Sequence, residues 1–311
     1  MIDTINFLLT ANKVGGVDFL ADTTPHLDAV GVHDFGNGRI SVSGRLGNFK
    51  VIVTEAAVKV RDGSLCKHYL GDNFKTMGRR QIGEAVESLS DELHLPMGEA
   101  KVTRLDVAAN IMMIHPPEVY FPYLGDKAFA KRLAEPHGIY YDLSGGRLCF
   151  YDKVAEQKAH KDPIPELYAG KNVLRYEQRY IRRIDKQLLY DVTGGVLSNE
   201  SFYKRLLDNW LLSYKSIKKL ADINVNFEIM SNKKDFERGI MLLGVNSIGG
   251  QEVLLQQIAE AQKKGILKRK QAYDLRQKLN DVCSLKSALV VESGLVSELD
   301  KKMQQAIAFY R

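Results

Sequence analysis

Two apolar segments of this 311-residue chain each carry one carboxylate among hydrophobic neighbours. Asp106 lies within residues 101–111, and Glu177 lies within residues 173–180. The length and composition of both segments predict buried strands. Taking an unpaired carboxylate out of water is costly, so each of the two must meet an arginine, a lysine or a metal ion.

Arginines share the strand faces of both carboxylates. Because alternate side chains of a strand point to the same side, Arg104 lies beside Asp106, while Arg175 and Arg179 flank Glu177. If the two strands are near each other in one sheet, the carboxylates could hold Mg²⁺ or Mn²⁺, hard cations that prefer oxygen ligands. The same residues could instead form a ladder of internal ion pairs. The residue pattern leaves both arrangements open.

A tyrosine stands at the end of a third apolar segment. Tyr151 follows residues 146–150 and precedes a polar stretch, so its phenol could be presented at the rim of a sheet. A tyrosine can attack a phosphodiester and form a reversible covalent intermediate. Lys153, two positions on, would favour a phenolate or neutralise phosphate charge. Tyr140 and Tyr141 are nearby candidates for the same role, and a packing role is open for all three.

The elements that would position these residues indicate a mixed fold. Turn signals at residues 36–38 and 47–48 separate β-prone runs and predict hairpins. Apolar residues recur at helical spacing over residues 82–93, and a short charged helix is predicted over residues 156–161 before Pro163. We therefore predict an α+β fold, mainly an antiparallel sheet with packed helices.

The last third of the chain changes to a helical pattern. Apolar spacing predicts an amphipathic helix over residues 201–219 and two helices over residues 251–282, broken at Gly265. A pair of glycines precedes this region and marks a boundary. We predict a domain of residues 1–194 that carries the chemistry, and a helical, DNA-binding or accessory domain of residues 195–311.

Composition excludes several classes of protein. The chain has no run of about eighteen apolar residues, so neither a transmembrane helix nor a membrane partner is expected. Its first residues lack the basic start of a signal peptide. Cys66, Cys149 and Cys283 are odd in number and widely spaced, which fits neither a disulfide framework nor a zinc site. We therefore expect a cytoplasmic protein.

Basic charge is concentrated in the second half. Residues 1–150 carry 16 Lys and Arg against 18 Asp and Glu, whereas residues 151–311 carry 28 against 20. This asymmetry indicates a polyanionic partner, although a basic surface without a ligand gives the same count. The densest cluster surrounds Gly265 and consists of Lys263, Lys264, Lys268, Arg269 and Lys270.

Three ordered blocks resemble the gene II/X replication proteins of filamentous phages and related plasmids. The blocks are residues 103–106, 148–156 and 174–179. They are similar to the arginine–hydrophobic–aspartate strand, the tyrosine–lysine block and the Arg-aromatic-Glu strand that the initiators of staphylococcal rolling-circle plasmids also share. The resemblance covers roughly residues 1–190. The combination of three blocks is specific, whereas no single block is.

The resemblance implies a role for each of these residues. Tyr151 is the expected nucleophile, because it stands in the tyrosine-x-lysine-x-x-glutamate block. Asp106 and Glu177 are the expected ligands of Mg²⁺ or Mn²⁺, with Glu156 a weaker candidate. The paired histidines that bind metal in many rolling-circle nucleases are absent, which leaves the full ligand set open. Contacts to phosphate or DNA are expected from Lys153, Arg175, Arg104 and Arg179.

The implied function is rolling-circle replication initiation. A metal-dependent endonuclease of this type nicks one strand of an origin through a 5′-phosphotyrosine, leaves a free 3′-hydroxyl and later religates. The expected partners are origin DNA and the host helicase and polymerase; a homodimer is open. A relaxase or transposase with the same chemistry, a water-using metal nuclease and a non-catalytic DNA-binding replication regulator are alternatives.

Overall fold

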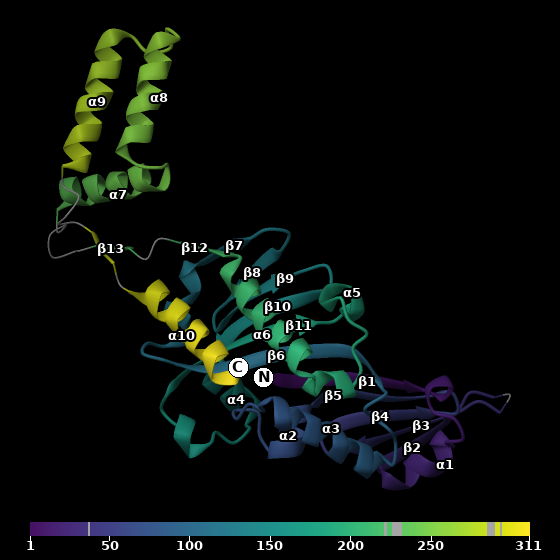
Figure 1. The fold of residues 1–311 in the computed structure, drawn as a ribbon. Helices are drawn as coiled ribbons and strands as arrows, with labels where there is room; N and C mark the ends of the chain where they lie inside the picture. The colour runs from purple at the N-terminus through teal and green to yellow at the C-terminus, as the bar shows by residue number, and fades with distance from the viewer. Residues whose placement is uncertain (37, 221–222, 226–231, 285–289, 293) are drawn as a thin grey trace. The chain divides into compact units, whose positions relative to one another are not determined.

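The structure is a computed structural model. The chain folds into two compact units (Figure 1). The first unit consists of Met1–Leu220 together with Ser297–Arg311, and the second of Ala221–Val296. In the part of the chain that the structure describes, no helix has the length and apolar character needed to cross a membrane. The described residues are 1–36, 38–220, 223–225, 232–284, 290–292 and 294–311.

A ten-stranded sheet forms the frame of the first unit (Figure 1). Its strands are β1 (Ile2–Thr10), β2 (Asp28–Asp34), β3 (Ile40–Leu46), β4 (Phe49–Thr54), β5 (Ala57–Ser64), β6 (Lys101–Met113), β8 (Lys131–Glu135), β9 (Gly138–Asp142), β10 (Gly146–Asp152) and β11 (Asn172–Tyr180). Their order across the sheet is β2-β3-β4-β5-β1-β6-β11-β10-β9-β8, and all neighbours are antiparallel. A separate pair joins β7 (Leu124–Lys127) to β12 (Ile217–Lys219).

Helices and short 3₁₀ turns complete this unit. The helices are α1 (Phe19–Thr23), α2 (Leu65–Leu70), α3 (Arg79–Leu93), α4 (Lys153–His160), α5 (Ile184–Leu188), α6 (Glu200–Lys215) and α10 (Leu295–Tyr310). The 3₁₀ turns are Ala11–Lys13, Thr24–His26, Pro117–Val119, Phe121–Tyr123, Glu166–Tyr168 and Gly195–Ser198.

One face of the sheet is covered and forms the core. Along β4, Phe49 and Val51 are fully buried, whereas Lys50 between them is exposed. On the covered face of β11, the Tyr176 ring packs 4.4 Å from that of Trp210 in α6, measured between ring centroids. The period-two alternation of burial thus separates an apolar face under helices from a face that is open over part of the sheet.

The second unit is a small group of helices with one strand pair. It contains α7 (Lys233–Ser247), α8 (Gln251–Lys263) and α9 (Arg269–Cys283), and β13 (Ile223–Val225) pairs with β14 (Val290–Glu292). Gly265 adopts a φ of +74° in the turn after α8, a conformation that glycine enters without strain. The buried core of this unit consists of Leu242, Val245, Leu279, Val282 and Cys283.

The structure confirms the predicted α+β class with its antiparallel sheet and C-terminal helices. The predicted boundary after residue 194 differs from the structural division, because α6 buries Trp210 against the sheet and α10 returns to the first unit. The helix predicted over residues 201–219 ends at Lys215, and residues 217–219 form β12 instead. The hairpin predicted around residues 36–38 is present, although Asn37 itself lies outside the described residues.

Candidate active site

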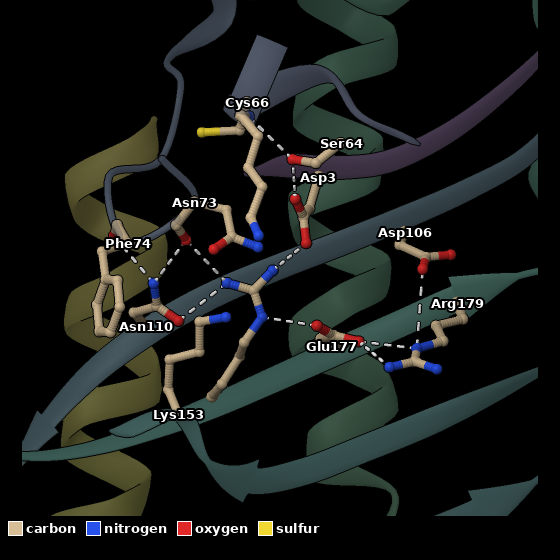
Figure 2. Close-up of polar contacts among 12 residues, drawn as sticks. Asp3, Ser64, Cys66, Asn73, Phe74, Asp106, Asn110, Lys153, Glu177 and Arg179 are labelled. Carbon is tan, nitrogen blue, oxygen red and sulfur yellow. Dashed lines mark hydrogen bonds and ion pairs between the residues drawn. The ribbon is translucent and has the colours of Figure 1, made fainter. Parts of the chain in front are cut away.

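Three neighbouring strands bring the candidate residues onto one face of the sheet. Strand β11 lies between β6 and β10, and its Arg179 and Arg175 stand directly opposite Asp106 and Tyr151. Directly opposite residues of antiparallel strands share a face, so Glu177 projects on the same side as these four. Figure 2 shows Asp106, Glu177 and Arg179 in this arrangement.

The phenol of Tyr151 is tied to a carboxylate. Its hydroxyl donates a hydrogen bond to Glu177 Oε1 over 2.7 Å. Burial raises the pKa of Tyr151 well above its ordinary value of 10, and the negative charge of Glu177 adds to the effect. The phenol therefore keeps its proton at neutral pH, and that proton points at a potential acceptor.

Glu177 is held by two arginines of its own strand. Arg175 Nε donates to Oε1 at 2.6 Å, and Arg179 Nε donates to Oε2 at 2.7 Å. Burial alone would raise the pKa of Glu177, but the guanidinium groups of Arg175 and Arg179 outweigh it and lower this pKa to about 2. In this arrangement Glu177 is ionised and is a weak base.

Asp106 is paired in the same way. Arg104 binds it with two hydrogen bonds, from Nε to Oδ1 at 3.1 Å and from Nη2 to Oδ2 at 2.7 Å. Arg179 Nε lies 3.7 Å from the same Oδ2. Burial raises the pKa of Asp106 to about 6 against the opposing effect of Arg104.

A guanidinium thus stands where the predicted metal ion would lie. Arg179 contacts both Asp106 and Glu177, and Arg104 takes up both oxygens of Asp106. Among the described residues, no group of three or more His, Cys, Asp or Glu side chains is placed to hold a metal. Of the two arrangements that the sequence left open, the ion-pair ladder is the one present, and as arranged it does not fit a divalent ion. The predicted ligand roles stay predictions.

Arg175 is the centre of a buried network that extends away from Tyr151. Its guanidinium forms an ion pair with Asp3 in β1 and donates to Asn110 Oδ1 at 3.0 Å and to the Asn73 carbonyl at 3.2 Å. Asp3, Asn110 and Asn73 are labelled in Figure 2. Asp3 also accepts a hydrogen bond from the Ser64 hydroxyl. The side chain of Arg175 is only 1% exposed. These contacts are all internal, and the expected contact of Arg175 with phosphate stays a prediction.

Sequence reasoning missed Asp3, although the signal was available. Asp3 lies in an apolar first strand, next to Ile2 and close to Ile5. The rule that a lone carboxylate in an apolar strand needs a cation, which identified Asp106 and Glu177, applies equally to it.

The next two candidates lie on α4. This helix starts at Lys153 because the Asp152 carboxylate caps it, accepting hydrogen bonds from the amides of Val154 and Ala155. Lys153 Nζ is buried and donates to Glu156 Oε2 at 2.7 Å. Burial and the neighbouring Arg175 lower the pKa of Lys153.

A pocket of about 320 Å³ opens beside Tyr151. Lys153 and Arg175 are not among its lining residues, whereas Glu156 and Arg179 are. The polar side chains that line it include His137, Tyr140, Tyr151, Glu156, His160 and Arg179.

The two rival tyrosines are placed differently. Tyr141 is fully buried, and its hydroxyl donates to the carbonyls of Leu124 and Gly125, as expected of a packing residue. Tyr140 lines the pocket with Tyr151. Its hydroxyl lies over Gly138, where a Cβ would approach it to 2.9 Å, and Gly138 is the cross-strand partner of Tyr151. Because both tyrosines line the same pocket, a substitution of Tyr140 is the control for a substitution of Tyr151.

The basic cluster of the second unit is exposed. Lys263 ends α8 and Arg269 begins α9, so the cluster occupies the turn between two helices. None of its members forms an ion pair with another described residue at 4.0 Å or less. The exposed members are Lys263, Lys264, Lys268, Arg269 and Lys270.

One known protein family matches most of the first unit. Residues 1–199 match the family described as the N-terminal region of the gene II replication-associated protein of phages. Comparison with curated proteins gave no significant match. The matched region contains all ten strands of the sheet and the whole Tyr151 pocket.

Proposed function

The chain belongs to the gene II family of phage replication-associated proteins, and from that premise we propose that it initiates rolling-circle replication by nicking one DNA strand with Tyr151. Membership of the family implies DNA as the partner. One observation carries the proposal beyond the family: the Tyr151 hydroxyl lies at a pocket wall, hydrogen-bonded to a carboxylate and close to an arginine that faces the pocket.

The first step is capture of the scissile phosphate in the pocket. Arg179 is the cation best placed to bind it, because this side chain both lines the pocket and contacts Glu177. A phosphate that takes over this guanidinium removes a positive charge from Glu177. Loss of that compensation raises the pKa of Glu177 and makes it a better base.

Proton transfer and attack then follow. Glu177 accepts the proton of the Tyr151 hydroxyl along the existing hydrogen bond, and the phenolic oxygen attacks phosphorus. A bond forms between tyrosine and the 5′-phosphate while the bond to the 3′-oxygen breaks. The proton held by Glu177 passes through solvent to the 3′-oxygen, which leaves as a hydroxyl that can prime synthesis. Attack by a 3′-hydroxyl on the phosphotyrosine reverses the reaction and joins the strand.

The predicted Mg²⁺ or Mn²⁺ ion is part of the proposal but not of these steps. Asp106 and Glu177 supply the oxygen chemistry that such an ion prefers. Arg179 would first have to leave the space between them. When bound, the ion would add positive charge beside the phosphate.

Other partners follow from the chemistry of the origin. The exposed basic turn between α8 and α9 is proposed to bind duplex phosphates, which gives affinity with little sequence choice. The host helicase and polymerase are proposed to act on the strand and the 3′-end that the nick releases.

A covalent-adduct assay tests the proposal. Supercoiled plasmid carrying the cognate origin is incubated with the full chain and Mg²⁺ or Mn²⁺, and labelled DNA attached to protein is resolved on a denaturing gel. Tyr151→Phe should abolish the adduct and keep DNA binding, while Tyr140→Phe should leave the adduct in place. An adduct that survives in Tyr151→Phe and disappears in Tyr140→Phe would move the nucleophile to Tyr140.

The same assay separates the alternatives. Nicking without any covalent product indicates hydrolysis by water, and binding without nicking indicates a replication regulator. Transfer of the attached strand to a second DNA molecule, in preference to circle formation, indicates a relaxase or transposase.

A further inference from the structure

The face of the sheet that carries the active site continues beyond it as an open surface. Strands β3, β4, β5, β1 and β6 are consecutive in the sheet, and Phe49, Val51 and Val53 of β4 point to the opposite, covered face. Cross-strand partners on the open side include Arg45 with Lys50 and Lys50 with Arg61. The row continues through Asn6, whose partner is Arg104.

A local irregularity turns β6 so that this row meets the active site. The register between β1 and β6 shifts between Asn6 and Phe7. Thr103 is exposed and Arg104 partly so, whereas Val102 and Leu105 are buried, so two consecutive side chains leave the core. Such a shift re-aims side chains at a functional site. Arg104 therefore belongs both to the open row and to the ion-pair ladder of Asp106.

The open row is basic although this half of the chain carries a slight excess of acid. Arg45, Lys50, Lys59 and Arg61 are all exposed. Among the described residues, the first three form no ion pair within 4.0 Å, and Arg61 has only Asp62 at 4.0 Å. Two further carboxylates lie beside the row: Asp28 is the cross-strand partner of Arg45, and Asp106 pairs with Arg104. The row thus keeps uncompensated positive charge.

We propose that this row, Arg45, Lys50, Lys59, Arg61 and Arg104, is a track that binds the phosphates of single-stranded DNA and leads the strand to Tyr151. The proposal deepens the proposed function and rests on it. Four steps from β3 to β6, each of about 4.8 Å, give the track a length of about 19 Å, which is enough for several nucleotides.

The shape of the surface favours a single strand over a duplex. A major groove about 12 Å wide admits a helix or a two-stranded ribbon, but not a face built from five strands. A positively charged surface that follows the backbone is a recurrent way of binding single strands.

The track also predicts the kind of binding. Its exposed residues are cations, with Ile52 and Leu8 half-buried between them and no aromatic side chain among the open-face residues of these five described strands. Without aromatic platforms for base stacking, affinity must come mainly from phosphate contacts. Binding should therefore depend strongly on salt and little on sequence.

Salt titration of single-strand binding tests the track. The full chain with Tyr151→Phe, which prevents cleavage, is titrated with a fluorescent oligothymidine of about 20 nucleotides from about 50 to 200 mM salt. Lys50→Gln, Lys59→Gln and Arg61→Gln are then added to this background. The slope of log K against log salt, which is negative, should become less steep by about 2, since each lost phosphate contact removes about 0.7. Between about 50 and 200 mM salt, the affinity advantage of the unmodified track should therefore shrink about twentyfold on the same relation.

A matched variant controls for net charge. Arg80→Gln, Lys204→Gln and Lys301→Gln remove three exposed cations from helices α3, α6 and α10 and should leave slope and affinity unchanged. An equal loss in both triple variants, or no loss in the first, would overturn the track.

The outcome separates the track from the proposed function. If Tyr151 forms an adduct but the track variant binds single strands normally, the track alone fails. If the slope falls as expected while the unmodified chain makes no adduct, the proposed function alone fails.

Discussion

Arg179 stands opposite Asp106 on the neighbouring strand, and its guanidinium lies between that carboxylate, 3.7 Å away, and Glu177 at 2.6 Å. One cation thus serves two anions. Because the same arginine lines the Tyr151 pocket, a phosphate bound there would compete with the two carboxylates for it.

Replacing this arginine should create the metal site that the sequence predicted. Arg179→Gln leaves Asp106 and Glu177 facing each other with one cation fewer, so Mn²⁺ should bind the DNA-free protein at least tenfold more tightly, about 1.4 kcal/mol. Isothermal titration calorimetry measures this without reference to activity. Arg147→Gln is the control, since Arg147 pairs with Asp142 instead. Equal or weaker Mn²⁺ binding in Arg179→Gln would contradict the ligand roles.

Glu177 should make stability depend on pH. Its pKa is about 2 in the folded protein against 4.5 ordinarily, so the folded state binds this proton more weakly than the unfolded state. The stabilisation is complete above about pH 4.5 and is lost as pH falls towards 2. Over that window it amounts to about 3 kcal/mol, from about 1.4 kcal/mol per pKa unit.

Comparison with Glu177→Gln isolates this contribution. The difference in unfolding free energy between the two proteins, measured in urea, should shrink between about pH 4.5 and 3. Glu87→Gln, an exposed carboxylate on α3, controls for the general effect of acid. A difference that stays constant down to about pH 3 would show that the arginines do not lower this pKa.

The sequence was sufficient to predict the strands that carry the site. A lone Asp106 or Glu177 in an apolar run has few physical explanations, and both segments form central strands. The spacing of Ile82 and Leu89 likewise identified α3, because a face buried on a sheet must be apolar. These features depend on local pattern alone.

The partners of those residues depend on pairing between distant strands. Whether Arg179 faces Asp106 is fixed by the register of β11 against β6, which no local pattern encodes. Strand β8 was missed because its residues are mostly polar at an edge of the sheet. The basic row from Arg45 to Arg61 was missed because its members are scattered along the chain and only strand pairing assembles them.

Asp3 should position Arg175, and through it Glu177 and Tyr151. Asp3→Asn leaves the buried guanidinium short of one anion and should lower the unfolding free energy by about 3–5 kcal/mol. Ser64→Ala removes only a hydroxyl partner of Asp3 and should cost about 1 kcal/mol. Urea denaturation measures both.

A readout beyond stability distinguishes positioning from mere support of the fold. At a temperature where Asp3→Asn is folded, adduct formation should slow while single-strand affinity stays unchanged, because Asp3 is not part of the pocket lining. Unchanged adduct formation in the folded variant would confine Asp3 to a structural role.

The basic turn between α8 and α9 should govern duplex binding. Changing Lys263, Lys264, Lys268, Arg269 and Lys270 to Gln in the full chain removes five exposed cations. On duplex DNA each phosphate contact steepens the negative slope of log K against log salt by about 0.9. The slope should therefore become less steep by about 4.5 if all five cations take part. Fluorescence anisotropy with a duplex origin fragment measures it.

The single-strand track supplies the matched comparison for that turn. The five-fold variant should bind oligothymidine as the unmodified chain does, whereas the Lys50, Lys59 and Arg61 variant should keep most of its duplex affinity. This crossed pattern is expected because the two sets of cations lie in different units of the chain. A duplex slope that is unchanged in the five-fold variant would leave the basic turn as an exposed surface without a DNA ligand.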